Sequence, residues 1–296
     1  MQESKNSRSG YVALAGRPNV GKSTLMNALL DFKLSIVTAK PQTTRKKILG
    51  ILNGENFQII FIDTPGIIKP GYSLQNVFMQ YVNEALEDAD VICLMSDVSA
   101  GSPAVHPDLL TYRRISKPLI MVLNKIDLIE KGRLLPIIDE FRKKFPRASI
   151  VPVSAIRRDG IGEIIQEIVS YLPEHPPYFP QDYLSDQNER FFVSEIIREK
   201  IFQLYSKEVP YACHVEIEEF IEQKDRKDVI RAVIYVDQPS QKGILIGKQG
   251  QALKKVGESA RKDIETFLDR PVYLELYVKV LKNWRKKLSK LRSLGF

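Results

Sequence analysis

One eight-residue stretch near the start of the chain constrains its fold more than any other. It reads Gly16-Arg17-Pro18-Asn19-Val20-Gly21-Lys22-Ser23 and fits the pattern G-x-x-x-x-G-K-[ST]. Residues 11–15 before it form an apolar run typical of a buried strand, and residues 24–30 after it have the pattern of a helix. A strand, a glycine-rich turn and a helix N-terminus together present backbone N–H groups to anions. We therefore predict a phosphate-binding loop rather than a turn that binds nothing.

The pattern also assigns roles to single side chains of this loop. Lys22 is expected to reach the terminal phosphates of a nucleotide, and the Ser23 hydroxyl is expected to bind Mg²⁺. The glycines permit the tight turn and the close approach of the backbone to the ligand. The predicted phosphate contacts are Asn19, Val20, Gly21, Lys22, Ser23 and Thr24.

The bulk composition places limits on the class of protein. A chain of 296 residues with 44% hydrophobic residues is long enough for two globular domains. It contains no run of eighteen apolar residues, and residues 1–10 are polar without a targeting pattern, so we expect a cytoplasmic protein. Cys93 and Cys213 each lie in an apolar run, which predicts buried thiols rather than a disulfide or a metal site. The net charge of +8 favours an anionic partner.

Strand and helix patterns alternate through the first part of the chain, which predicts an α/β domain with a mostly parallel sheet and helices on both faces. The short turn at residues 53–56 joins two strands as a hairpin, so one edge strand should be antiparallel. The expected strands are 11–15, 47–52, 57–62, 91–95, 119–123 and 150–153, and the expected helices are 23–30, 75–86, 109–115, 134–144 and 161–171.

Four prolines within residues 173–180 interrupt this alternation and predict a semi-rigid linker. We therefore divide the chain into a domain at 1–172, a linker at 173–190 and a smaller α+β domain at 191–296. The second domain is expected to contain helices at 191–205, 242–246 and 251–268 and strands at 212–222, 228–236 and 272–280. A basic helix should follow at 282–294.

Three further motifs follow predicted strands of the first domain. Asp63-Thr64-Pro65-Gly66 ends one strand, where Asp63 is suited to hold Mg²⁺ and the Gly66 N–H to meet a γ-phosphate. Asn124-Lys125-Ile126-Asp127 ends another, and an Asp carboxylate accepts from both N1–H and N2–H₂ of guanine, which adenine lacks. Ser154-Ala155 ends a third and offers a backbone N–H to guanine O6. Together the four motifs predict a site for GTP and GDP with Mg²⁺.

With these motifs the chain resembles the translation-factor-related P-loop GTPases, and most closely the Era-like ribosome-assembly GTPases of the TrmE-Era-EngA-like family. The resemblance covers nearly all residues. Besides the nucleotide motifs it rests on Lys40-Pro41-Gln42-Thr43-Thr44-Arg45, Asp186-Gln187-Asn188-Glu189-Arg190-Phe191 and Glu195-Ile196-Ile197-Arg198-Glu199-Lys200.

The resemblance implies a first switch at Thr43-Thr44, in which one threonine hydroxyl completes the Mg²⁺ shell when GTP is bound. We favour Thr44, so the expected metal ligands are Ser23, Thr44 and Asp63, and the residues expected to act in catalysis are Lys22, Thr44 and Gly66. Many small GTPases have Gln directly after D-x-x-G to orient the attacking water, but Ile67 stands there. We therefore expect slow hydrolysis that depends on charge stabilisation, with K⁺ near Asn19 as the resemblance to cation-dependent relatives suggests.

A second short motif, Gly247-Lys248-Gln249-Gly250, opens the helix predicted at 251–268. Alone it is typical of a turn between helices. The order helix–strand–strand–helix–GxxG–helix–strand, however, matches a type II KH module, whose loop clamps the backbone of single-stranded nucleic acid. We expect Gly247, Lys248, Gln249, Gly250, Lys242 and Lys254 to bind RNA.

These features predict a GTP-hydrolysing switch joined to an RNA-binding module. By resemblance to the family, the RNA is the 3′ end of 16S rRNA, the role is maturation of the 30S subunit, and peripheral membrane association is a further expectation. We expect a monomer. One alternative is a signalling GTPase whose basic C-terminal domain binds phospholipid. The other is an RNA-binding protein with a vestigial nucleotide site, although Lys22, Ser23, Asp63 and Asp127 are all present.

Overall fold

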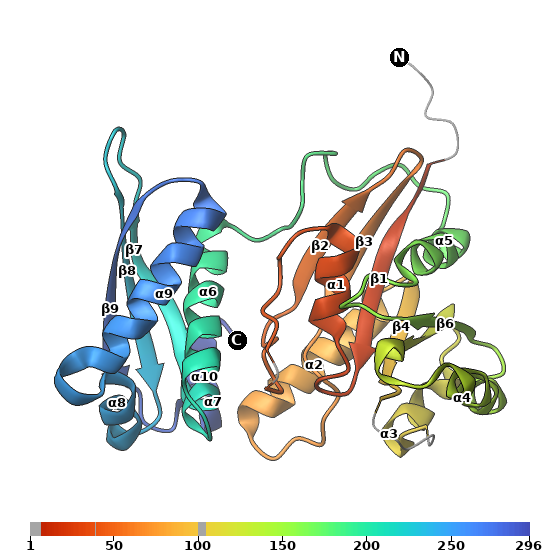
Figure 1. Ribbon diagram of the computed structural model, residues 1–296, viewed down its shortest axis with the longest axis horizontal. Helices are drawn as coiled ribbons and strands as arrows, with labels where there is room; N and C mark the ends of the chain where they lie inside the picture. The colour runs from red at the N-terminus through yellow and green to blue at the C-terminus, as the bar shows by residue number, and fades with distance from the viewer. Residues whose placement is uncertain (1–6, 39, 100–104) are drawn as a thin grey trace. The chain divides into compact units, whose positions relative to one another are not determined.

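The computed structural model describes residues 7–38, 40–99 and 105–296 of the chain (Figure 1). Residues 1–6 of the polar N-terminal segment lie outside the described residues. The chain divides into two compact units, one formed mainly by residues before Gln187 and one mainly by Gln187–Phe296.

The first unit is built on a six-stranded sheet with the order β2-β3-β1-β4-β5-β6. β2 pairs with β3 in antiparallel orientation at one edge, and the other neighbours are parallel. This confirms the predicted mostly parallel sheet and its antiparallel edge strand. The strands are β1 (Arg8–Gly16), β2 (Ile48–Asn53), β3 (Phe57–Asp63), β4 (Val91–Asp97), β5 (Leu119–Asn124) and β6 (Ser149–Val153).

Helices cover both faces of this sheet. Apolar side chains of α2, α3 and α4 pack with alternate residues of β4 and β5 in one core. α1 and α5 contact each other and lie in front of the sheet in Figure 1. The helices are α1 (Lys22–Leu30), α2 (Ser73–Asp88), α3 (Pro107–Leu110), α4 (Lys131–Lys144) and α5 (Ile161–Tyr171), with 3-10 turns η1 (Thr111–Arg114) and η2 (Ile126–Leu128).

The helix predicted at 109–115 is wrong in its bounds. Its α-helical part, α3, starts at Pro107, because the His106 side chain accepts a hydrogen bond from the backbone N–H of Asp108 and caps the first turn. The chain then tightens into η1.

The proline-rich segment is tied to the first unit along its sheet edge. Buried Gln58 of β3 accepts from the N–H groups of Tyr178 and Phe179 at 2.7 and 2.9 Å. Further along, Ile51 of β2 donates its N–H to the carbonyl of Leu184 at 2.9 Å, and the Ser185 hydroxyl donates to the carbonyl of Leu49. This segment therefore covers the outer edge of β2, which an open sheet would leave with unpaired backbone groups.

The second unit packs helices against a three-stranded sheet of order β7-β8-β9. β7 is antiparallel to β8, and β8 is parallel to β9. Side chains of α6 and α9 fill the core with the inward residues of the strands. The elements are α6 (Glu189–Leu204), α7 (Val209–Ala212), β7 (His214–Ile221), β8 (Asp228–Val236), α8 (Pro239–Ile246), η3 (Lys248–Gly250), α9 (Gln251–Leu268), β9 (Val272–Val280), η4 (Trp284–Lys286) and α10 (Leu288–Ser293).

The single basic helix predicted at 282–294 is wrong. Asn283 adopts a left-handed backbone conformation (φ 60°), so the segment begins as the short turn η4 and becomes helical only in α10. Trp284 is fully buried, its indole N–H donates to the carbonyl of Ala212 at 2.9 Å, and its ring stacks on Phe296. Burial of this one aromatic ring therefore decides the path of the C-terminal segment.

Two expectations from composition can be compared with the structure. Cys93 and Cys213 are both buried free thiols, as predicted. None of the helices in the described part of the chain combines the length and apolar character needed to cross a bilayer.

Replacing the tryptophan should destabilise the second unit selectively. Trp284→Ala removes a fully buried ring and its hydrogen bond, and we expect a loss of about 3–5 kcal/mol in the free energy of unfolding of this unit. Leu288→Ala in the same segment removes a side chain that is 56% exposed and should change stability by less than about 0.5 kcal/mol. Urea unfolding followed by circular dichroism measures both, and equal stability of the two variants would contradict the packing role of Trp284.

Candidate GTP site and nucleic-acid groove

The phosphate-binding motif lies at the carboxyl end of β1, where the strand order of the sheet changes direction. β1 has β3 on one side and β4 on the other, and ligands of open α/β sheets bind at such a point. Gly21 has φ 97° and caps the N-terminus of α1. A Cβ there would lie 2.2 Å from the side-chain nitrogen of Asn124, so only glycine fits. The loop conformation is thus fixed by the neighbouring strand as well as by its own sequence.

Lys22 is buried below this loop. Its ammonium group donates to the carbonyl oxygens of Gly16 and Arg17 at 3.2 and 3.1 Å. Burial lowers the pKa of Lys22 to about 8, although the nearby Asp63 carboxylate acts in the opposite direction. A phosphate placed in the loop would therefore meet a cation that carries little hydration.

The three predicted metal ligands converge at the end of β3. The Ser23 hydroxyl donates to Oδ2 of Asp63 at 2.9 Å, and the Thr44 hydroxyl donates to the same oxygen at 3.2 Å. Ser23 and Thr44 are themselves 2.9 Å apart. The structure thus brings Thr44 to the predicted position beside Ser23 and Asp63.

The environment of Asp63 fits a divalent cation. The residue is fully buried, and burial raises the pKa of its carboxyl group. Its Oδ1 has no hydrogen-bond partner among the described residues. A buried carboxylate oxygen without a partner, next to two hydroxyl oxygens, is the kind of hard oxygen donor set that Mg²⁺ prefers.

The residues that follow Asp63 line the floor of the loop. Thr64 donates its hydroxyl to the carbonyl of Leu14 and is buried. A Cβ on Gly66 would lie 2.7 Å from the backbone nitrogen of Pro18, so this glycine lets the two loops approach each other. Ile67 packs in the apolar core with Ala15. Its side chain is therefore directed into the protein interior.

The predicted base-recognition residues are held together by hydrogen bonds. Asn124 donates to the carbonyl of Val20 at 2.8 Å and accepts from the N–H of Ala155 at 3.0 Å. It therefore braces the phosphate loop against the Ser154-Ala155 loop. Asp127 accepts from the Ser154 hydroxyl through Oδ1 at 2.6 Å, and its side chain is only 6% exposed. This hydrogen bond fixes the Asp127 carboxylate beside the Ser154-Ala155 loop, the other predicted base-recognition segment.

Sequence reasoning missed two residues beside this part of the site. Asp97, the last residue of β4, forms an ion pair of 2.5 Å with Lys125. Arg157 lies with its Nε 4.0 Å from Oδ2 of Asp127. Neither residue belongs to a motif. The position of Asp97 at the end of a parallel strand was nevertheless a signal, because ligand-binding residues gather at such strand ends.

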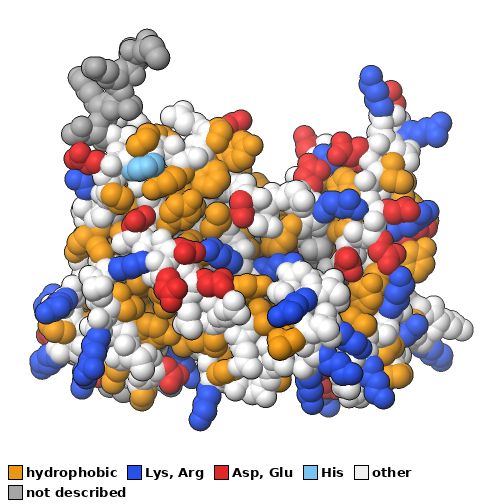
Figure 2. Space-filling model, turned by 180° about the vertical axis from the view of Figure 1, so that it is seen from behind, with side chains coloured by type: hydrophobic (Ala, Val, Ile, Leu, Met, Phe, Trp, Pro, Cys, Tyr) orange, Lys and Arg blue, Asp and Glu red, His pale blue; other side chains and the backbone are white. Residues whose placement is uncertain are grey.

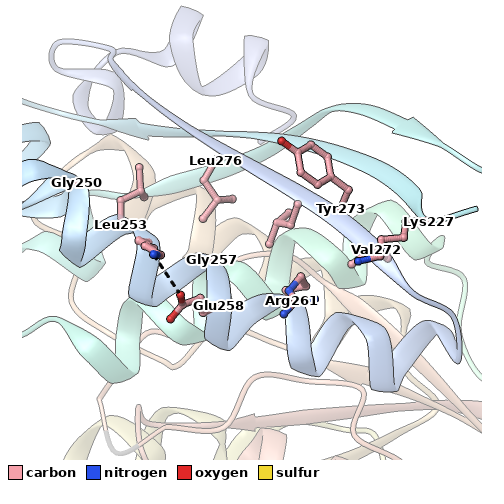
Figure 3. Close-up of a pocket in the computed structure, with 11 residues that line it drawn as sticks. Lys227, Gly250, Leu253, Gly257, Glu258, Arg261, Val272, Tyr273 and Leu276 are labelled. Carbon is pink, nitrogen blue, oxygen red and sulfur yellow. Dashed lines mark ion pairs between the residues drawn. The ribbon is translucent and has the colours of Figure 1, made fainter.

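The second unit contains a groove that starts at the Gly-x-x-Gly turn. Figure 3 shows side chains of α9 and β9 that face each other across it. Gly247 (φ 71°) and Gly250 (φ 78°) take left-handed conformations on either side of Lys248 and Gln249. The lining residues are Lys227, Gly250, Leu253, Lys254, Gly257, Glu258, Arg261, Val272, Tyr273, Leu274 and Leu276.

Of the predicted RNA contacts, Gly250 and Lys254 line this groove, and Lys248 and Gln249 belong to the turn at its end. Lys242 lies on α8, which leads into the turn. Figure 2 shows Lys and Arg side chains gathered at the lower end of the second unit, on the right of that view. The groove therefore combines basic side chains (Lys227, Lys254 and Arg261), an apolar wall and a turn with glycine at its first and last positions.

The fold and the two sites define a P-loop GTPase with a C-terminal KH module. Residues 11–125 match the family model described as 50S ribosome-binding GTPase, and residues 208–285 match the KH domain model. The chain is 45% identical over 294 residues to the GTPase Era of Syntrophus aciditrophicus, a match that covers 98% of this chain and 95% of the relative. The chain belongs to the Era family of GTPases.

Two solved structures of Era proteins are similar to this chain over nearly its full length. The crystal structure of a single-residue variant of Aquifex aeolicus Era bound to GDP·AlF4⁻ matches with a TM-score of 0.92 and 42% identity, covering 97% of this chain and 99% of that one. A structure of Era in complex with MgGDPNP and nucleotides 1506–1542 of 16S ribosomal RNA matches with a TM-score of 0.93 and 42% identity, covering 98% and 99%. As a member of this family, the chain is a GTPase that converts GTP and water to GDP and phosphate.

Exchanging the base-recognition carboxylate should change the preferred nucleotide. In Asp127→Asn the amide oxygen still accepts from N1–H, but its NH₂ group opposes guanine N2–H₂ and instead matches the C2 carbonyl of xanthine. We expect GTP affinity to fall by at least about a hundredfold and affinity for xanthosine triphosphate to rise. Calorimetric titration with both nucleotides measures the change. Asp139→Asn, at an exposed acid of α4, should leave both affinities unaltered, and an unchanged GTP affinity in Asp127→Asn would exclude its proposed role.

Proposed function

We propose that this chain is a GTP-driven switch that binds the 3′ end of 16S rRNA through its KH groove and acts in maturation of the 30S subunit. The observation that carries the proposal is the groove between α9 and β9, which begins at the Gly-x-x-Gly turn of a chain that also holds a GTP site. The Era structure with nucleotides of 16S ribosomal RNA supports the choice of RNA.

In the GTP site, each residue has its own role in binding or hydrolysis of GTP. Lys22 would transfer its hydrogen bonds from two backbone carbonyl oxygens to phosphate oxygens and stabilise the negative charge that develops during hydrolysis. Ser23, Thr44 and Asp63 would hold Mg²⁺, which when bound neutralises charge on the phosphates. The N–H of Gly66 would meet the γ-phosphate. Because Ile67 is packed in the core, no side chain directly after Gly66 orients water, and we infer slow intrinsic hydrolysis.

The groove of the second unit suits single-stranded RNA. β9 lies at the edge of its sheet, so its outer backbone groups have no strand partner among the described residues and can pair with base edges. Leu253 and Leu276 offer an apolar surface to base faces, while Lys254 and Arg261 on the rim are suited to bind phosphates. At Gly250 a phosphate can approach the backbone closely.

The structure favours RNA over the phospholipid alternative. A membrane-surface helix inserts its apolar side chains into the lipid, and the expected helix at 282–294 would have used Trp284 and Leu291 for this. Both are buried in the second unit, of the apolar residues between them only Leu288 is present and exposed, and the segment is not one continuous helix. Peripheral membrane association therefore has no support from this segment.

The proposal also includes coupling between nucleotide and RNA. GTP has a γ-phosphate that GDP lacks, and Thr44 belongs to a segment that such a phosphate orders. A difference in RNA affinity between the two nucleotide states would follow if the order of this segment biases the RNA-binding unit.

A single charge at the turn tests the RNA site. Gly250→Asp adds a Cβ that meets no heavy atom within 4 Å beyond its chain neighbours, and Asp tolerates the left-handed conformation of this position. Gly250→Asn has the same shape without the charge and serves as its control. We expect Asp to weaken binding of an RNA matching the 16S 3′ end by at least about tenfold relative to Asn, because it opposes a phosphate.

Fluorescence anisotropy with this RNA and a scrambled RNA, each with a non-hydrolysable GTP analogue and with GDP, measures the affinities. The proposal predicts preference for the matching RNA and tighter binding in the GTP state. The RNA function would be rejected if both variants bound both RNAs with equal affinity. Binding of the protein to anionic vesicles would then favour the lipid function.

A cation dependence of hydrolysis is part of the proposal. Asn19 lies in the phosphate loop with φ 64°, and we propose that its side chain helps to hold K⁺ near the phosphates. Phosphate release should then be faster in K⁺ than in Na⁺ buffer of equal ionic strength, and Asn19→Ala should remove the difference. An identical rate in both buffers would refute the K⁺ role and leave the Mg²⁺ site unaffected.

A further inference from the structure

A serine outside every motif contacts the carboxylate at the centre of the metal site. Ser35 follows α1 by five residues and is only 2% exposed. Its hydroxyl donates to Oδ2 of Asp63 at 3.1 Å, the oxygen that also accepts from Ser23 and Thr44. Three hydroxyl groups thus share one carboxylate oxygen, and only two of them belong to the predicted metal ligands.

Ser35 is held in place from the other side by Asn27 of α1. The side chain of Asn27 accepts from the N–H groups of Leu34 and Ser35, both at 2.9 Å, and donates to the carbonyl of Ser35 at 2.9 Å. Both polar atoms of the amide are therefore used to fix one short piece of backbone. Through Ser35, hydrogen bonds therefore link Asn27 of α1 to Asp63 at the end of β3.

The three hydroxyl groups have different tasks once Mg²⁺ is considered. A hydroxyl oxygen that binds a cation directs its lone pair to that cation, so Ser23 and Thr44 would reorient. Ser35 has no such task and keeps its proton directed at Asp63. Ser35, Thr44 and Asp63 all belong to the first unit, so this contact lies within one compact body.

We propose that Ser35 is a positioning residue that orients the Asp63 carboxylate for Mg²⁺ and is itself positioned by Asn27. Outer-shell hydrogen bonds of this kind orient metal-binding carboxylates, and their loss weakens metal binding. The inference rests on the proposal that Ser23, Thr44 and Asp63 hold Mg²⁺ together with the nucleotide.

The test separates binding of the nucleotide from binding of the metal. GDP affinity is measured by calorimetry in EDTA and in a series of Mg²⁺ concentrations for the wild-type chain, Ser35→Ala and Ser9→Ala. Ser9 is the matched control, because it is a fully buried serine of the same unit whose hydroxyl has no hydrogen-bond partner among the described residues.

We expect Ser35→Ala to bind GDP in EDTA like the wild type but to need about tenfold more Mg²⁺ for the same gain in affinity. Ser9→Ala should follow the wild type in both conditions. An unchanged Mg²⁺ response in Ser35→Ala would overturn the inference. If wild-type GDP affinity did not respond to Mg²⁺ at all, the metal site itself would be refuted, which is a different result.

A second variant covers the case in which Ser35→Ala does not fold. Ser35→Cys leaves no cavity, because sulfur is somewhat larger than oxygen, and it offers only a weak donor. It should show a reduced Mg²⁺ response with unaltered GDP binding in EDTA. A wild-type Mg²⁺ response in Ser35→Cys would also count against the inference.

Discussion

The burial of one carboxylate, that of Asp63, is the constraint on which the first unit depends. An isolated charge in a protein interior is costly, so its surroundings must supply donors or a cation. Ser23 from the phosphate loop, Thr44 from the first switch and Ser35 from the segment after α1 all direct hydroxyl groups to it. Three pieces of chain that are distant in sequence are therefore brought to the end of β3 by a single electrostatic requirement, and Oδ1 is left for a ligand.

Much of the fold and most of the site could be predicted because their signals are local. Short apolar runs located the strands and helical spacing of apolar residues located the helices, and α9 and β9 have the predicted bounds. The motif residues lie together because parallel strands end at one edge of a sheet. Ser35 could not be found in this way, since its role arises from contacts between segments with no fixed spacing. Asp97 stands at the end of a parallel strand, a signal that the search for motifs did not use. The C-terminal helix was wrong because amphipathic spacing cannot show that Trp284 turns into a core.

The groove of the second unit could be predicted only in part from the sequence. The Gly-x-x-Gly turn alone carried little information, and the order of elements around it made the KH module recognisable. The basic residues of the rim are ordinary surface lysines and arginines in the sequence, so only the structure shows which of them, such as Lys227 from the β7–β8 hairpin, reach the same groove as Gly250. Which basic residues lie on the rim of the groove is determined by tertiary folding and not by a local sequence pattern.

The attachment of residues 181–186 along β2 has a consequence for the biosynthesis of the first unit. A ribosome delivers the sheet strands first, so the nascent chain has an uncovered β2 edge until Leu184 and Ser185 have emerged and bonded to Ile51 and Leu49. During that interval the edge is open to pairing with other nascent chains. A polypeptide shortened to end at Leu172 would retain this exposure permanently and should aggregate, whereas one ending at Asp186 would carry its own cover.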